Sequence, residues 1–232
     1  MLSSLSPLRP HSTAKSTESL LDETLLPLPL ESICSQETPE KLSKLKQHPN
    51  DFRVLDLDIE TRLVGFHKGG RFNPDGCEPI AIAWSFYDSQ RVESRQLGVD
   101  APEQMLLDFV AAFHAANMVT GHYLRKFDLP IINSALAERG LPLLGPKLVS
   151  DTKLDLKNIS GISKKQENLA EMLALAESKY HMTDVQWRKA SRLTPDGITE
   201  TARRVRKDVR QHKLLRAALV QAKLLNPPKV WQ

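Results

Sequence analysis

Cysteine is scarce in this sequence: Cys34 and Cys77 are the only two among 232 residues. Two cysteines cannot build the disulfide framework of a small secreted domain, and the lack of a Cys-x-x-Cys pair argues against a structural zinc site. Long apolar runs are also missing, because no stretch approaches the ~20 residues of a membrane span. We therefore expect no membrane partner, no secretion signal and a cytoplasmic location, which would be the host cytoplasm if the chain is viral.

Strong net charge is absent as well. The hydrophobic fraction of 41% and charged fraction of 26% are ordinary for a soluble globular protein. The net charge of +4 is compatible with a polyanionic partner but is a weak indication alone. The distribution of charge is more informative, because residues 203–216 are rich in lysine and arginine and contain a single acid, Asp208.

The chain divides into two parts by composition. Residues 1–50 are interrupted by proline and rich in serine, which predicts a flexible or loosely docked extension. Residues 51–232 carry the periodic patterns of a folded domain. They predict strands at 52–61, 79–87, 91–99, 118–122 and 147–152, and helices at 102–116, 126–139, 163–176, around Trp187 and from 194 to about 225. This order favours an α/β fold with a mixed five-stranded sheet flanked by helices and the first strand at its centre.

The first predicted strand contains the segment VLDLDIET, in which Asp56, Asp58 and Glu60 occupy alternate positions. Alternate side chains of a strand share one face, so these carboxylates would stand side by side. Acids on a strand are often a solvated face or protect an edge. A central strand instead needs a cationic group opposite them. Mg²⁺ and Mn²⁺ prefer oxygen ligands, and a pair of such ions can promote phosphodiester cleavage.

Two further acids are candidates for the same site. Asp128 falls in the first turn of the helix after strand 118–122, where the helix dipole alone would favour a carboxylate. Asp208 lies at the margin of an apolar stripe on the last helix, four residues after Arg204. An ion pair between these two residues is the alternative interpretation.

These segments resemble the motifs of a known family. Asp58-Ile59-Glu60-Thr61, then Gly121-His122 leading to Phe127-Asp128, then Asp208-Val209, are similar to the three motifs of the DEDD superfamily of 3′–5′ exonucleases. That superfamily includes the proofreading domains of DNA polymerases and has a ribonuclease H-like fold. The resemblance covers about residues 52–216. It implies that Asp58, Glu60, Asp128 and Asp208 bind two Mg²⁺ or Mn²⁺ ions, with Asp58 bridging them.

The resemblance also assigns contacts with nucleic acid, and the sequence departs from it at two places. Ile59 and Thr61 would contact the terminal nucleotide, and Phe127 would support the site. The family's second motif usually has Asn where this chain has Tyr123. The family's Tyr or His, four or five residues before the last Asp, is replaced by Arg204 and Arg203. The residue that usually orients the attacking water is therefore missing.

Three outcomes of that replacement are open. Arg204 binds the scissile phosphate while metal alone activates water, a histidine such as His181 or His212 substitutes, or the enzyme is slow or inactive. His122 is expected to pack in the core or beside the site, and Asp56, which has no role in the family pattern, to lie beside the ligands or at the rim.

Other residues are candidates for binding the rest of the substrate. Arg125, Lys126, Lys164, Lys165 and the basic face of the last helix could hold the nucleic-acid backbone. Tyr123, Trp187 and Phe66 are candidate stacking surfaces for bases, with core packing as the alternative.

The leading functional hypothesis is a metal-dependent 3′–5′ exonuclease that releases nucleoside 5′-monophosphates. Single-stranded DNA 3′ ends are favoured as substrate, in replication or repair, with a separate DNA polymerase or replisome component as partner. Three alternatives stay open: an exoribonuclease, a non-catalytic nucleic-acid-binding protein with a degenerate DEDD site, and an interaction module that docks a polymerase through residues 1–50.

Overall fold

The computed structural model describes residues 52–64, 76–177 and 179–232. The predicted extension over residues 1–50 and the candidate stacking residue Phe66 lie outside the described residues, so both stay predictions. None of the described helices is both long and apolar enough to cross a lipid bilayer.

The centre of the fold is a mixed six-stranded sheet with the order β3-β2-β1-β4-β5-β6. Its strands are β1 (Val54–Leu63), β2 (Cys77–Phe86), β3 (Glu93–Gln96), β4 (Met118–Gly121), β5 (Lys147–Asp151) and β6 (Lys229–Trp231). β4 runs parallel to β1 and β5 parallel to β4, whereas the β1–β2, β2–β3 and β5–β6 pairs are antiparallel. The α/β class, the mixed sheet and the interior position of the first strand are confirmed.

The predicted number of strands was too low by one. β6 is only three residues long, follows Pro227 and Pro228, and leaves Val230 62% exposed at the edge of the sheet. So short and exposed a strand carries no alternating apolar pattern from which it could be predicted.

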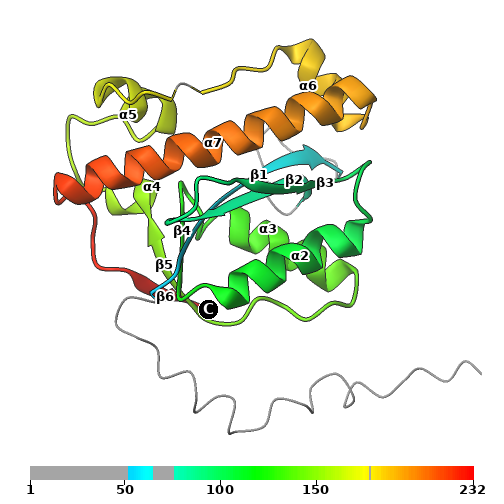
Figure 1. Cartoon of the computed structure of the whole chain (residues 1–232), viewed down its shortest axis with the longest axis horizontal. Helices are drawn as coiled ribbons and strands as arrows, with labels where there is room; N and C mark the ends of the chain where they lie inside the picture. Colours follow the sequence, from blue (N-terminus) through cyan, green and yellow to red (C-terminus); the bar gives the residue numbers. More distant parts are fainter. Residues whose placement is uncertain (1–51, 65–75, 178) are drawn as a thin grey trace, which may run out of the picture. The chain divides into compact units, whose positions relative to one another are not determined.

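Helices cover both faces of the sheet. α7 (Pro195–Gln221) crosses one face, and α2 (Pro102–Ala115) and α3 (Asp128–Glu138) lie on the other (Figure 1). The remaining helices are α4 (Thr152–Asp155), α5 (Gln166–Met172) and α6 (Asp184–Ser191), of which α6 packs against α7. The sequence did not predict α4, a single turn directly after β5.

The two predicted capping boxes have different outcomes. Thr183 and Gln186 form the predicted box at the start of α6. The box predicted for Ser163 and Gln166 is wrong, because α5 begins at Gln166 and its N-cap residue is Lys165, whose side chain makes no capping hydrogen bond. The Gln166 amide instead donates hydrogen bonds to the backbone oxygen of Asp208 and to the side chain of Gln211, both on α7. The Gln166 side chain is therefore engaged with α7 and is not available to cap the start of α5.

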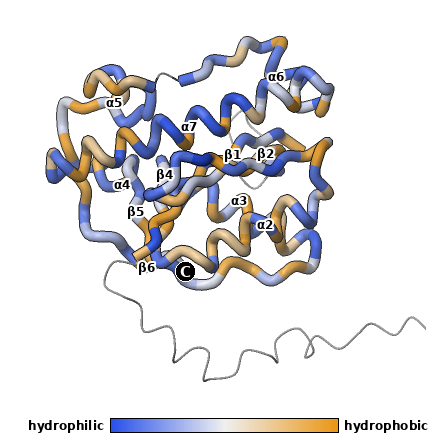
Figure 2. Tube along the Cα trace, viewed as in Figure 1, coloured by the Kyte–Doolittle hydropathy of each residue, from blue (hydrophilic) through white to orange (hydrophobic). Residues whose placement is uncertain are grey.

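The packing of α7 brings it close to the sheet. The large side chains of the core, including Phe109 and Phe113 of α2, fill the opposite face. Against α7 the sheet presents two alanines of β2, Ala81 and Ala83, which pack on Val205 and Val209. Figure 2 shows α7 alternating between hydrophobic and hydrophilic residues along its length. The small alanines let the polar stripe of α7 reach the side chains of β1.

Candidate active site

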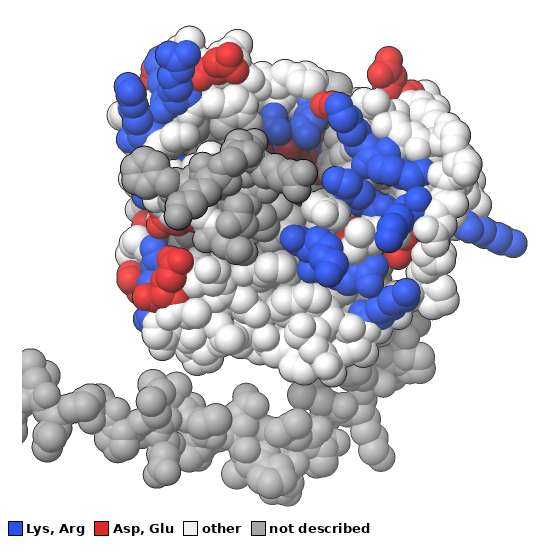
Figure 3. Space-filling view, turned by 180° about the vertical axis from the view of Figure 1, so that it is seen from behind, with Lys and Arg blue, Asp and Glu red and all other residues white. Residues whose placement is uncertain are grey.

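The four acids that the family resemblance assigns as metal ligands line one cavity of about 380 Å³; they are Asp58, Glu60, Asp128 and Asp208. The topology explains its position, because β1 pairs with β4 only over Val54–Asp56 and then continues beside β2. Asp58 and Glu60 therefore lie beyond the end of β4, at the carboxyl edge of the parallel strands, which is where α/β sheets usually bind ligands. On this face, lysine and arginine side chains gather around recessed acidic groups (Figure 3).

Three of the acids form a compact group. Asp58, Glu60 and Asp208 can each offer a carboxylate oxygen such that all three atoms lie within 4.8 Å of one another. Asp208 Oδ1 is buried and has no hydrogen-bond partner among the described residues. A buried acceptor without a donor is costly, and a divalent cation with a preference for oxygen would satisfy it. The triad therefore fits a divalent metal ion.

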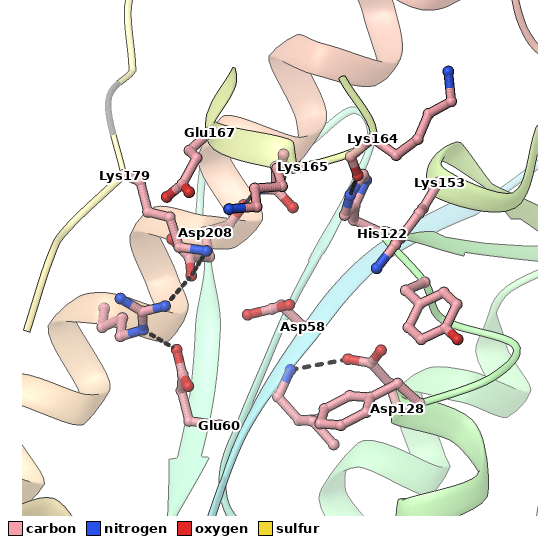
Figure 4. A pocket seen from close by; sticks show the side chains of 15 residues that line it. Asp58, Glu60, His122, Asp128, Lys153, Lys164, Lys165, Glu167, Lys179 and Asp208 are labelled. Carbon is pink, nitrogen blue, oxygen red and sulfur yellow. Dashed lines mark hydrogen bonds and ion pairs between the residues drawn. The ribbon is translucent and has the colours of Figure 1, made fainter. Parts of the chain in front are cut away.

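The fourth acid, Asp128, is the first residue of α3 and is buried. Its Oδ1 accepts a hydrogen bond of 3.2 Å from the backbone nitrogen of Ile59, between Asp58 and Glu60. Its carboxylate points toward Asp58 (Figure 4). The structure thus brings together residues that are up to 150 positions apart in sequence. That they bind metal remains a prediction.

The electrostatics of the cavity disfavour four bare carboxylates. Burial, followed by the charges of Asp208, Asp128 and Glu60, raises the pKa of Asp58 well above its usual value. Burial raises the pKa of Glu60 to about 7 against the opposing effect of Arg204. Burial also raises the pKa of Asp128 to about 8 against the hydrogen bonds that its carboxylate accepts from backbone groups. A bound cation would remove this repulsion, and pKa values raised in this way are common at functional sites.

Arg204 sits directly against the acids. Its Nε donates a short hydrogen bond to Glu60 Oε1, and its Nη2 is 3.6 Å from Asp208 Oδ2. Its Nη1 donates to the backbone oxygen of Tyr180 at 2.6 Å, and its guanidinium lies 4.9 Å from the centre of the Trp187 ring. The pair with Asp208 was the alternative weighed from sequence, and it is present, whereas the contact with Glu60 had no sequence signal.

Further cations line the cavity. The sequence did not single out Lys179 or Lys153. Lys179 Nζ is 4.0 Å from Asp208 Oδ2, and Lys153 Nζ lies 3.9 Å from the centre of the Tyr123 ring. Lys164 and Lys165 also line the cavity, although Lys164 Nζ donates to the backbone oxygens of Ile159 and Ile162. Lys153 follows a parallel strand, a position that the topology could have flagged. Lys179 lies in an irregular segment without a periodic signal.

The contacts between α7 and β1 form a regular series that we call the α7–β1 ladder. It consists of Arg204, Asp208, His212 and Arg216 on α7 and of Asp56, Asp58 and Glu60 on β1. Arg204 meets Glu60, Asp208 meets Asp58, and His212 and Arg216 both meet Asp56. The ladder explains how β1 can carry Asp56 and Glu60, because basic side chains of α7 face both of them. Asp58 instead faces another carboxylate, Asp208, and this pair lacks such a partner on α7 opposite Asp58.

The inner end of the ladder is a buried hydrogen-bonded chain. Asp56 is fully buried, 3.0 Å from His212 Nδ1 and 3.3 Å from Arg216 Nε. His212 Nε2 is 3.2 Å from Thr152 Oγ1, which is 2.9 Å from His122 Nδ1. Asp56 is therefore not at the rim of the site. His212 is absent from the cavity lining, which favours a structural role over the general-base role considered from sequence.

His122 connects this chain to the cavity wall, as expected for a residue beside the site. Its Nε2 is 2.9 Å from the backbone oxygen of Lys164, an acceptor, so this nitrogen carries the proton. Burial and then the electrostatic effect of the neighbouring His212 ring lower the pKa of His122 to about 3. A neutral His122 thus holds the segment that carries Lys164 and Lys165.

The turn after β4 presents Tyr123 to the cavity. Tyr123 has a positive φ of 79°, and the carboxylate of Asp151 accepts hydrogen bonds of 3.0 Å from the backbone nitrogens of Tyr123 and Arg125. The Arg125 side chain pairs with Asp155 at 3.7 Å. Because this ion pair occupies the Arg125 guanidinium, Arg125 is a weaker candidate for binding the nucleic-acid backbone.

The other predicted residues are distributed as follows. Ile59 and Phe127 line the cavity, but Thr61 and Lys126 are not among its described lining residues. His181 is exposed and lines an adjoining cavity that shares Lys179 and Glu167 with the first. Burial raises the pKa of Asp208, and Arg204, Lys179 and then His181 oppose this rise. The roles predicted for these residues in substrate binding and catalysis stay predictions.

The comparisons with known proteins identify the fold. No protein-family model matches the sequence, and no curated protein matches it significantly. Among solved structures, the family B DNA polymerase from the hyperthermophilic archaeon Pyrobaculum calidifontis is similar with a TM-score of 0.61 and 18% sequence identity. The match covers 75% of this chain and 25% of the polymerase chain. The domain therefore has the fold of a region that makes up a quarter of that polymerase, consistent with a ribonuclease H-like architecture.

Proposed function

We propose that this protein is a metal-dependent 3′–5′ exonuclease that releases nucleoside 5′-monophosphates from single-stranded DNA ends. The observation that carries the proposal is the meeting of Asp58, Glu60, Asp128 and Asp208 in one cavity that basic side chains surround. These are the positions that the resemblance to DEDD exonucleases assigns to metal ligands. The similarity of the fold to part of a DNA polymerase supports the same assignment.

The residues of the cavity divide into two groups by the work they would do. Asp58, Glu60, Asp208 and Asp128 would hold the metal, which when bound activates water and stabilises charge on the reacting phosphate. Lys153, Lys165 and Lys179 would attract the phosphates of the incoming strand, a contact that every sequence shares. Tyr123, with Lys153 over its ring, offers a face on which a base can stack.

Arg204 and His181 are two candidates for the role of the family's missing water-orienting Tyr or His. Arg204 already contacts Glu60, Asp208 and the backbone oxygen of Tyr180, so its guanidinium has few donors left for a scissile phosphate. His181 is exposed beside the site and free of such a network in the described residues. We therefore favour His181 over Arg204 as the residue that assists the attacking water.

DNA is favoured over RNA because the similar solved structure is a DNA polymerase. We also propose a role in replication or repair alongside a separate polymerase, which the same similarity supports. The competing function is a nucleic-acid-binding protein without catalysis, which the pairing of Arg204 and Lys179 with the acids favours.

The test uses a 5′-labelled oligonucleotide and the Asp58→Asn variant. We expect the parent protein to shorten the strand stepwise from its 3′ end only when Mg²⁺ or Mn²⁺ is present, and Asp58→Asn to lose this activity by at least ~100-fold, as expected for loss of a metal ligand. Asp88→Asn, which changes an exposed acid in the turn after β2, is the matched control and should act as the parent does.

A parent protein that binds DNA but releases no mononucleotide with either ion would contradict the proposal and favour the binding protein. DNA and RNA oligonucleotides of one sequence, compared in the same assay, would distinguish the two exonuclease classes, because only RNA has the 2′-hydroxyl.

A further inference from the structure

The place where the family has a water-orienting residue is occupied by a cation that four parts of the fold hold in position. Arg204 contacts Glu60 on β1, Asp208 on its own helix, the backbone oxygen of Tyr180 and the ring of Trp187 on α6. Its side chain is only 12% exposed. An arginine with a fork of donors that is fixed on several sides is pre-organised, and little freedom is lost when it stays in place.

Arg204 uses some carboxylate oxygens of the triad and leaves others open. Its guanidinium faces Glu60 Oε1 and Asp208 Oδ2, and Lys179 also approaches Asp208 Oδ2. Asp208 Oδ1, on the other side of the same carboxylate, is buried without a hydrogen-bond partner among the described residues. Asp58, Glu60 and Asp208 can each offer one carboxylate oxygen within 4.8 Å of the other two, so the geometry provides one place for an ion within the triad.

A second place is poorly provided. Asp128 Oδ1 accepts the hydrogen bond of Ile59, and Asp128 belongs to no group of three clustered metal-ligating side chains among the described residues. An ion between Asp58 and Asp128 would have only these two carboxylates from the described part of the protein. Mg²⁺ retains several waters at such sites, but its affinity falls as the number of charged ligands falls.

Charge balance gives an independent reason. Arg204 and Lys179 contact the acids directly, and Lys153, Lys164 and Lys165 also line the cavity. One divalent ion can bind to the three clustered carboxylates. A second would have to be placed beside these cations, which is unfavourable where water is restricted.

We infer that the site binds a single divalent ion, at Asp58, Glu60 and Asp208, and that Arg204 supplies the positive charge that the family resemblance assigns to a second ion. This inference rests on the proposed function but goes beyond it. It makes Arg204 a positioning residue that holds the Glu60 and Asp208 carboxylates, and it explains why an arginine can stand where the family has a tyrosine or histidine.

The experiment counts bound ions instead of measuring activity. The full chain is titrated with Mn²⁺ by calorimetry, and the loaded protein is examined by electron paramagnetic resonance, both with and without an oligonucleotide that ends in a phosphorothioate linkage. We expect one Mn²⁺ per chain and the six-line spectrum of an isolated ion in both conditions. Two ions sharing Asp58 would instead be spin-coupled.

Substitutions at Arg204 test the cause. Arg204→Gln removes the charge and should raise the stoichiometry from one to two, with a coupled spectrum. Arg204→Lys keeps the charge and should stay at one. Arg203→Gln is the matched control, since Arg203 is exposed on the next position of α7, stacks on Tyr180 and has no described contact with the acids. Circular dichroism establishes that each variant is folded.

Two coupled ions in the parent would overturn the inference and leave the proposed exonuclease intact. One ion in both the parent and folded Arg204→Gln would show that Arg204 is not the reason for the single ion and would overturn that part. No bound ion in the parent, together with no metal-dependent cleavage, would overturn the proposed function as well.

Discussion

Tyr123 has a backbone conformation that tyrosine rarely adopts. Its φ of 79° lies in the left-handed region, where a bulky side chain is a genuine outlier. Strain of this kind costs on the order of 1–3 kcal/mol and persists where the surroundings impose it. The surroundings here are the Asp151 carboxylate, which accepts hydrogen bonds from the backbone on both sides of Leu124. The result is a ring held at the cavity beside Lys153, as a stacking platform for a base requires.

Replacing Tyr123 with asparagine should separate stability from binding. Asparagine tolerates the left-handed region, so Tyr123→Asn is expected to raise the free energy of unfolding by about 1 kcal/mol in urea titrations. The same change should weaken the binding of a single-stranded oligonucleotide by about tenfold, since base stacking contributes about 1–3 kcal/mol. Tyr123→Phe keeps both the strain and the ring and should match the parent in both measurements. A less stable Tyr123→Asn would mean that the ring packs in the fold and does not serve the substrate.

At the residue scale, the sequence predicted the acids better than their partners. Period-two spacing on a strand marks Asp58 and Glu60, and the family motifs mark these two together with Asp128 and Asp208. The partners of Asp56 and the contact of Arg204 with Glu60 were not identifiable, because they depend on which helix covers the strand. Local propensity carries no information on such a tertiary pairing.

The α7–β1 ladder belongs to the scale of elements. Four residues of a helix advance about 6 Å and two residues of a strand about 6.6 Å, so an every-fourth series on α7 keeps step with an every-second series on β1. Both series are visible in the sequence as Arg204, Asp208, His212 and Arg216 and as Asp56, Asp58 and Glu60. What the sequence could not show is that the two elements cross the same face, which small Ala81 and Ala83 permit.

The inner contact of the ladder should contribute to stability. His212→Leu would leave the fully buried Asp56 with Arg216 alone, and losing a buried hydrogen bond to a charged group costs about 2 kcal/mol. Urea unfolding should therefore show a loss of that size, whereas Arg210→Leu on the exposed face of α7 should change the free energy of unfolding by less than about 0.5 kcal/mol.

A double-mutant cycle supplies the control for that prediction. In the Asp56→Asn background the charge on the partner is gone, so His212→Leu should cost at least about 1 kcal/mol less than it does in the parent. Equal costs in the two backgrounds would show that His212 stabilises the fold by packing and not through Asp56.

At the scale of the whole molecule, the sequence predicted the order of the main elements and the interior position of the first strand, and the structure confirms both. It missed α4 and β6, each too short for a periodic pattern, and overextended α5. The meeting of the four acids could be predicted because they lie on elements with strong signals. Lys164 and Lys165 were also named from the sequence, but Lys179 and Lys153 were not, because Lys179 lies in irregular backbone and Lys153 in a single helical turn.

The crowding of carboxylates should make the stability of the metal-free molecule fall as the pH rises. In the folded state Glu60 and Asp128 have pKa values of about 7 and about 8, above their ordinary values of 4.5 and 3.8. The folded protein therefore holds protons that the unfolded chain has released, and stability declines as pH increases through the folded pKa values. His122, with its pKa lowered to about 3 from 6.5, acts in the opposite direction, but only below its unfolded value. Between about pH 6.5 and 8.5, the change in the free energy of unfolding therefore reflects the titration of Glu60 and Asp128.

Thermal and urea unfolding in EDTA should show a decrease in the free energy of unfolding on the order of 2 kcal/mol across that window. Mg²⁺ binds the ionised carboxylates of the folded state alone, so it should stabilise the protein most at pH 8.5 and flatten the profile. In EDTA, Asp128→Asn should make the decrease in the free energy of unfolding smaller, and Asp88→Asn should leave that decrease unchanged. A profile in EDTA that is level or rises between pH 6.5 and 8.5 would mean that the four carboxylates do not share one desolvated cavity.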